Sequence, residues 1–106
     1  MDPITRAVVA ALEIGGPGSS QKPVLEAYQT LRIALQQKFG PESDLMNAVS
    51  ALEKKPESGG RQVVLHEEVV ATRADQDPYL LDLAQKLLKK ANQRKQAFLP
   101  PLQRPA

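Results

Sequence analysis

The alternation of apolar and polar residues predicts five helices, and the first is unlike the other four. Asp2 and Pro3 mark its start, because Asp caps free backbone N–H groups and Pro is tolerated at the first helical position. From Ala7 to Leu12 no polar residue occurs, whereas a surface helix shows a polar face. We therefore expect the helix over residues 1–14 to lie in the middle of a bundle or to be destined for a non-aqueous partner.

A linker rich in Gly, Pro and Ser follows at residues 15–23. Such a composition is typical of a flexible, solvated segment. We expect it to tether the first helix to the rest of the chain and to allow that helix to move.

An amphipathic helix is predicted over residues 23–39, where apolar side chains recur every three or four positions. We expect Gly40 to end it in the left-handed conformation and Pro41 to prevent its continuation. The apolar stripe consists of Val24, Leu25, Tyr28, Leu31, Leu35 and Phe39.

A third helix is predicted over residues 42–55. Its first turn carries acidic residues and its last turn basic ones, which matches the helix dipole. These residues are Glu42, Asp44, Lys54 and Lys55, and the core stripe is Leu45, Ala48, Val49 and Leu52.

Residues 61–74 fit either a strand or a helix. Most of the apolar residues are β-branched, which favours a strand. Val63, Val70 and Ala74 also recur at helical spacing, with residues 66–68 on the opposite side. No second strand is available for pairing, so we expect a helix whose buried face carries these two valines together with Val64 and Ala71.

The last helix starts at Asp77-Pro78 and has the strongest leucine stripe of the chain. Pro100-Pro101 stops it. The prediction is therefore an all-α protein: a small bundle of four amphipathic helices plus the apolar N-terminal helix, over residues 1–99, with a disordered tail or truncated linker at residues 100–106. The leucine stripe consists of Leu80, Leu81, Leu83, Ala84, Leu87, Leu88 and Ala91.

The charge is distributed unevenly along the 106 residues, although the net charge is only +2. Residues 1–85 carry 8 Lys or Arg against 12 Asp or Glu, whereas residues 86–106 carry 6 basic residues and no acidic one. Three interpretations are open for the basic end: complementing the helix dipole, binding an anionic membrane, or binding nucleic acid. The basic ridge Lys86, Lys90 and Arg94 has no interleaved aromatic residues, so we do not expect a nucleic-acid partner.

No catalytic or metal-binding pattern is present. His66 is the single histidine, and its neighbours Glu67 and Glu68 point to other faces of a helix, so we expect no metal site there. Cysteine is absent, and no phosphate-binding or nucleophile motif occurs. We expect a protein that is not an enzyme and that holds no cofactor.

The N-terminus resembles neither a secretion signal nor a membrane span. It opens with Asp2 instead of a basic residue, and Gly-Gly-Pro-Gly follows its apolar run. A helix of about twelve residues reaches roughly 18 Å, which is less than the ~30 Å hydrocarbon core of a bilayer.

Four stretches resemble a family of small bacterial N-terminal domains, the Bell domain. They are the opening MDPIT with its Ala/Val run, KFG at residues 38–40, ALEKKPES at residues 51–58 and ADQDP at residues 74–78. The Bell domain is regarded as a bacterial analogue of the fungal HeLo and HeLo-like domains and of the helical bundle of mixed-lineage kinase domain-like protein. The resemblance covers roughly residues 1–98.

The resemblance implies a cell-death domain that forms pores in membranes. An NLR-type receptor would template a C-terminal amyloid motif, which these 106 residues do not contain, and self-oligomerisation would then release the N-terminal helix. The protein would move from the cytoplasm to the inner face of the plasma membrane. The implied inserting residues are Ile4, Val8, Val9, Leu12 and Ile14, and the expected contacts with anionic lipid or a partner are Lys86, Lys89, Lys90, Arg94 and Lys95.

A second interpretation is a non-enzymatic adaptor of bacterial immune signalling, a death-like or effector-associated domain that binds other proteins. In that case the first helix stays in the core and surface charges select the partner. The same order of helices fits both interpretations.

Overall fold

Five α-helices make up the folded part of the chain, as predicted. The computed structural model describes residues 1–15, 18 and 20–97, with side chains up to residue 93, and within these ranges it contains helices and turns but no strand. The expected tail at residues 100–106 lies outside the described residues. The helices are α1 (Pro3–Glu13), α2 (Lys22–Phe39), α3 (Asp44–Lys54), α4 (Gly59–Thr72) and α5 (Pro78–Ala97), with a short 3-10 turn η2 (Ala74–Gln76) before α5.

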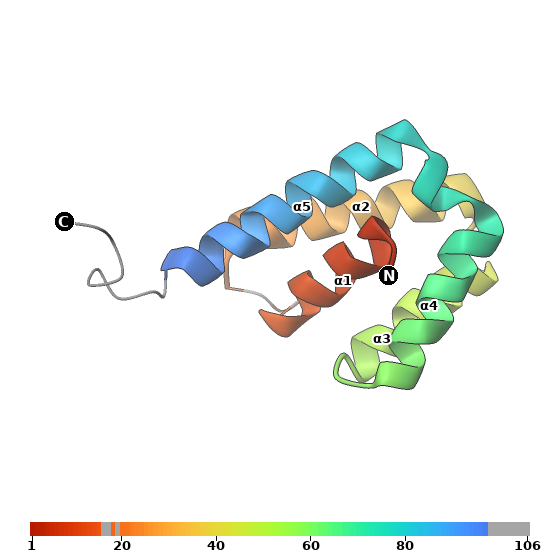
Figure 1. The fold of residues 1–106 in the computed structure, drawn as a ribbon, viewed down its shortest axis with the longest axis horizontal. Coiled ribbons are helices and arrows are strands. Elements are labelled where there is room, and N and C mark those ends of the chain that lie inside the picture. Colours follow the sequence, from red (N-terminus) through yellow and green to blue (C-terminus); the bar gives the residue numbers. More distant parts are fainter. Residues whose placement is uncertain (16–17, 19, 98–106) are drawn as a thin grey trace.

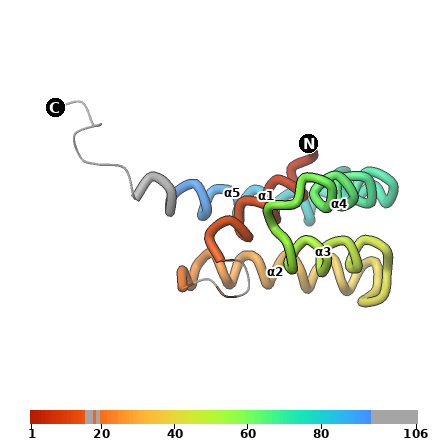
Figure 2. Tube along the Cα trace, turned by 90° about the horizontal axis from the view of Figure 1, so that it is seen from below, coloured from red at the N-terminus to blue at the C-terminus, as the bar shows by residue number. Residues whose placement is uncertain are grey.

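The helices form two layers. In Figure 2, α1, α4 and α5 lie in one layer above α2 and α3. Two pairs of helices connect the layers, because α2 packs against α5 and α3 packs against α4. Figure 1 shows α1 in the angle between these two pairs, beside α5 and in contact with α4.

The core is aliphatic and continuous across all five helices. α1, α2 and α3 supply most of it, and α4 adds only two residues of its own. The largest fully buried side chains are those of Tyr28, Ile4, Leu31, Leu35, Leu45, Leu52, Leu65, Leu80, Leu87, Val8, Val49 and Val69.

Polar side chains define where the helices begin. Asp77 caps α5, since its carboxylate accepts hydrogen bonds from the backbone N–H groups of Tyr79 at 2.9 Å and Leu80 at 3.3 Å. Ser43 caps α3 in the same way through Met46 N–H, at 3.2 Å. The third helix therefore begins at Asp44, and the prediction that Glu42 lies in its first turn was wrong.

Gly40 ends α2 but does not adopt the left-handed helical conformation that we expected. Its φ of 99° is positive, whereas its ψ of 146° is extended. Pro41 explains the difference, because a residue before proline is forced towards extended ψ values. A positive φ combined with an extended ψ is open to glycine alone, so the sequence Gly-Pro sets this turn.

The segment that fitted either a strand or a helix is the helix α4, but it buries a different face from the predicted one. Leu65 and Val69 are buried, whereas Val63, Val64 and Val70 are each about half exposed. The buried pair lies four residues apart, which is as good a helical spacing as the predicted stripe. Ala74 is buried as predicted, within η2.

A polar network joins α2 to α3. The Tyr28 hydroxyl donates to Glu53 Oε2 at 2.5 Å, and Arg32 Nε donates to the same oxygen at 2.9 Å. Burial, and then the hydrogen bond to Glu53, raise the pKa of Tyr28 well above its usual range. The hydrogen bond to Glu53 raises the pKa of Arg32 as well, so this network holds a neutral phenol and a guanidinium against one carboxylate.

Candidate functional site

The first helix begins at a buried cap and ends at a glycine. Pro3 occupies its first position, and Asp2, in an extended conformation, caps it. The N–H of Ile14 bonds back to carbonyl groups of the last turn, and Gly15 follows with a φ of 111°. A positive φ is open to glycine at little cost, so the helix ends where the expected tether begins.

All five residues that we expected to insert into a membrane lie in or against the core. Ile4, Val8 and Leu12 are 0%, 1% and 7% exposed. Val9 and Ile14 are partly buried and pack against the same core. The apolar character of α1 is thus satisfied inside the bundle, chiefly by packing against α5.

α1 lies within the bundle, but its outer side is not covered. Arg6 and Glu13 are exposed, and Val9 and Ala10 are partly so. These residues line a shallow hollow of about 260 Å³ that α4 and α5 border through Gln62, Leu88 and Asn92. The helix is therefore the middle member of a layer, with neighbours on both sides and a polar strip at the surface (Figures 1 and 2).

A cluster of three polar side chains holds the N-terminal end of α1. Asp2 Oδ1 accepts the N–H of Thr5 at 2.8 Å, and Oδ2 accepts the Thr5 hydroxyl at 2.6 Å. His66 of α4 places Nδ1 2.7 Å from the same Oδ2. The Asp2 side chain is only 3% exposed and Thr5 is fully buried, so this carboxylate is satisfied by protein groups instead of water.

The imidazole nitrogen of His66 also lies 3.3 Å from the backbone nitrogen of Asp2. One nitrogen cannot donate to the carboxylate and accept from the amide at once. The carboxylate contact is shorter, and its oxygen can only accept, so we assign the hydrogen to Nδ1. His66 is a boundary residue, with a side chain 36% exposed, and it has a specific partner 64 positions away in the sequence.

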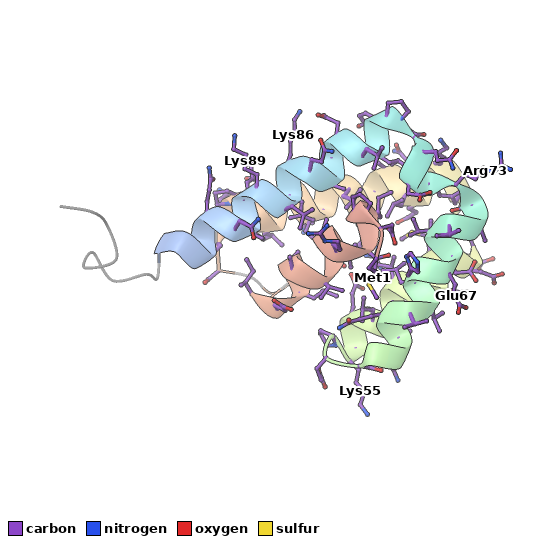
Figure 3. All side chains as sticks on the ribbon, in the orientation of Figure 1. Met1, Lys55, Glu67, Arg73, Lys86 and Lys89 are labelled. Carbon is purple, nitrogen blue, oxygen red and sulfur yellow. The ribbon has the colours of Figure 1, made fainter. Side chains whose placement is uncertain are left out.

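The basic residues of α5 whose side chains the structure describes are exposed at the surface of the helix. Figure 3 shows Lys86 and Lys89 pointing outward from α5. Lys86 forms an exposed ion pair with Asp82 at 3.0 Å, and Lys90 is exposed as well. The side chains of Arg94 and Lys95 lie outside the described residues, although both residues belong to α5.

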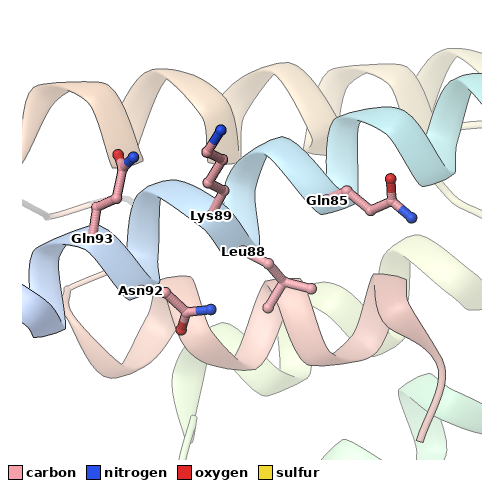
Figure 4. A pocket seen from close by; sticks show the side chains of 5 residues that line it. All are labelled: Gln85, Leu88, Lys89, Asn92 and Gln93. Carbon is pink, nitrogen blue, oxygen red and sulfur yellow. The ribbon is translucent and has the colours of Figure 1, made fainter.

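The surface of α5 has two different sides. Figure 4 shows Leu88 and Asn92 pointing towards α1, whereas Lys89 points to the other side of the helix. Together with Gln85 and Gln93 these residues line a hollow of about 440 Å³. Lys89 and the pair Leu88 and Asn92 thus point to different sides of α5, although all three border one hollow.

The described residues offer no metal site and no membrane span. Nowhere in the described part of the chain do three or more His, Cys, Asp or Glu gather as metal ligands would. Within the same residues, no helix has both the length and the apolar composition needed to cross a membrane.

A family model decides the identity of the fold. The model of the Het-E N-terminal domain matches residues 1–99. The chain belongs to the Het-E N-terminal domain family. The family is related to the fungal HeLo-like cell-death domains, so the chain is a helical cell-death domain and does not belong to a known enzyme family.

The relationship to fungal HeLo-like domains that the sequence predicted is therefore confirmed. The narrower assignment to the Bell domain stays a prediction. No curated protein and no solved structure matches the chain at a significant level.

Proposed function

We propose that this chain is a Bell-type cell-death effector whose α1 leaves the bundle and enters an anionic membrane after self-assembly. The observation that carries the proposal is the combination of an apolar α1 with a Gly- and Pro-containing segment behind it. Every large side chain that α1 buries is aliphatic, and Thr5 and the cap Asp2 are its only buried polar residues. Such a helix can exchange one apolar environment for another.

The free energy gained by burying the apolar side chains of α1 is similar in the protein core and in lipid. Burying a large aliphatic side chain contributes about 1.5–3 kcal/mol, whether the surroundings are a protein core or lipid. The exchange of Ile4, Val8 and Leu12 from core to lipid is therefore close to balanced. Self-assembly of several copies, which an NLR-type receptor would start, can then decide its direction.

The length of α1 limits how it enters the membrane. Its 11 residues reach about 16 Å, against the ~30 Å of the hydrocarbon core. Its exposed strip carries Arg6 and Glu13, which suits a helix lying in the interface with its apolar side down. Several copies would then have to assemble to form a pore. The protein would be cytoplasmic before activation and would form the pore at the inner face of the plasma membrane.

The lysines of α5 supply attraction to anionic lipid. Lys86, Lys89 and Lys90 are exposed on one side of α5, and each contributes about 1 kcal/mol near an anionic surface. We propose the same role for Arg94 and Lys95. The triple variant Lys86→Glu, Lys89→Glu and Lys90→Glu should bind vesicles of phosphatidylglycerol and phosphatidylcholine more weakly, and no better than vesicles of phosphatidylcholine alone.

The decisive experiment locks α1 in place. The chain has no cysteine, and Val9 of α1 and Leu88 of α5 line the same hollow. We therefore change both residues to Cys, so that a disulfide between them can lock α1 to α5. The protein is clustered on dye-filled anionic vesicles through a C-terminal tag, which imposes assembly. Reduced protein should release the dye, and the disulfide-locked form of the same protein should not.

The single variant Val9→Cys under the same oxidising conditions is the control, because it cannot form the internal disulfide. Dye release that is equal in the locked and reduced forms would contradict the proposal. So would a reduced, clustered protein that releases no dye.

A protein-binding adaptor is the second candidate, and the outer face of α4 favours it. Val63, Val64 and Val70 remain about half exposed there, which is a costly arrangement for a surface with no partner. A homotypic adaptor would cover this face with a second copy. Sedimentation velocity of the wild type and of the double variant Val64→Lys/Val70→Lys tests the adaptor. Only the adaptor predicts that the wild type self-associates through this face in the absence of membranes and that the two lysines abolish this self-association.

A further inference from the structure

The N-terminal end of α1 is held more firmly than an apolar helix needs. Two of the three hydrogen bonds to the Asp2 carboxylate come from Thr5, within α1 itself. The third comes from His66, which belongs to α4. This contact is thus a polar connection between α1 and the α3/α4 pair, whereas the apolar packing of α1 is mainly against α5.

The position of this contact along α1 matters. The C-terminal end of α1 continues into the segment that leads to α2, so the length of that segment limits how far this end can move. The N-terminal end lies farther along the chain from α2, so it moves farther when the helix leaves. Asp2, Thr5 and His66 hold this end, and they also keep the one carboxylate that α1 buries out of water.

We propose that the Asp2–His66 pair is an autoinhibitory latch, which keeps the travelling end of α1 between α4 and α5 until it is broken. The inference deepens the proposed function and rests on it, because it names the contact that must be lost before α1 is released. Breaking the pair removes a hydrogen bond from a buried carboxylate. Such a group is costly to leave unsatisfied, whereas in the open state water satisfies it.

A buried cysteine in α1 measures the opening directly. Val8 is 1% exposed and the chain has no other cysteine, so Val8→Cys reacts with a thiol reagent only when α1 opens. Val49 of α3 is equally buried, and Val49→Cys reports the opening of the bundle as a whole. The latch predicts that the cysteine at position 8 reacts faster than the one at position 49.

The variant His66→Ala tests the latch in the Val8→Cys chain. The imidazole is 36% exposed, so its removal leaves little space unfilled in the core. We expect roughly tenfold faster labelling at position 8, because a buried carboxylate then lacks one donor in the closed state only. His66→Asn keeps an N–H donor close to the place of Nδ1 and should label at nearly the wild-type rate.

Glu67→Ala is the matched control, because Glu67 is the next residue of α4 and is exposed. It should leave the labelling rate at position 8 unchanged. The latch is overturned if His66→Ala does not accelerate labelling at position 8, if His66→Asn accelerates it as much as His66→Ala, or if positions 8 and 49 react at the same rate in the wild-type background.

Dye release from anionic vesicles separates this inference from the proposed function. If His66→Ala accelerates both the labelling and the dye release, the latch and the membrane role stand together. If it accelerates the labelling while no form of the protein releases dye, the latch stands and the membrane role is wrong.

Discussion

Helices α1 and α3 have the same length, yet they are attached to the molecule in different ways. Each is 11 residues long, starts at a side-chain cap and buries one face. α3 lies between α2 and α4 in the chain and makes polar contacts with both. Glu53 binds Tyr28 and Arg32 of α2, and Arg61 of α4 donates to the carbonyl of Ala51 at 2.6 Å.

α1 is held across the molecule by the contact between Asp2 and His66 of α4. Opening α3 must break its polar contacts with both α2 and α4, whereas the proposed function requires α1 to open while the other four helices stay packed. We therefore expect the number of polar attachments, more than the amount of buried apolar surface, to decide which of the two helices opens first.

The same truncation in the two helices tests this difference most strongly. Leu52→Ala in α3 should lower the free energy of unfolding by about 2–5 kcal/mol in urea titrations, because Leu52 is fully buried. It should leave thiol labelling of Val8→Cys unchanged, since α1 opens without α3. Leu12→Ala in α1 should accelerate that labelling. Equal acceleration by both truncations would show that α1 opens only with the whole domain.

A smaller effect is expected from the network that fixes α3 to α2. Tyr28→Phe removes the hydroxyl that Glu53 accepts from and should cost about 1–2 kcal/mol at neutral pH. The pKa of Tyr28 is raised in the folded state, so above pH ~10 the unfolded chain loses the phenol proton first and the wild type becomes less stable. The cost of Tyr28→Phe should therefore shrink between about pH 10 and 11. A difference that does not change with pH would argue against the neutral buried phenol.

The smallest effect is expected where α2 meets the start of α5. Lys38 forms an ion pair with Asp77 there, and this contact, followed by the N–H of Leu80, lowers the pKa of the Asp77 carboxyl. Asp77→Asn keeps a capping oxygen but removes the charge, so we expect a fall in melting temperature smaller than that of Tyr28→Phe. The stabilisation is present above pH ~4 and is lost as the pH falls through the lowered pKa, so the difference in melting temperature should shrink as the pH is lowered below about 4. A difference that does not change with pH would show that the effect comes from the cap.

The starts of α1 and α5 could be predicted from the sequence, because they depend on neighbouring residues. Asp2-Pro3 and Asp77-Pro78 begin α1 and α5 as expected. The end of α4 carried no such signal, since Arg73 adopts the left-handed conformation with a φ of 59° and no glycine marks the place. The helix ends at Arg73 in a conformation that residues other than glycine rarely adopt. The amino-acid composition therefore could not indicate where α4 ends.

The contacts across the molecule could not be predicted. In α4 two apolar stripes have helical spacing, and only the packing against α1 and α3 selects the one with Leu65 and Val69. Asp2 is a helix cap and His66 is the single histidine, and they lie 64 positions apart. No pattern in the neighbouring sequence of either residue indicates that they are in contact. The exposure of Lys86 and Lys90 could be predicted from their spacing alone, because it depends only on the face of one helix.

The Asp2–His66 pair also gives the molecule a natural spectroscopic reporter. The chain contains one histidine and no tryptophan, so its imidazole carbon protons give a single isolated set of NMR signals. Because Nδ1 lies 2.7 Å from a buried carboxylate oxygen when α1 is in place, the ring senses whether that helix is seated. Signals of one residue can therefore follow whether α1 is in place in unlabelled protein, in a mixture of states and in the presence of vesicles.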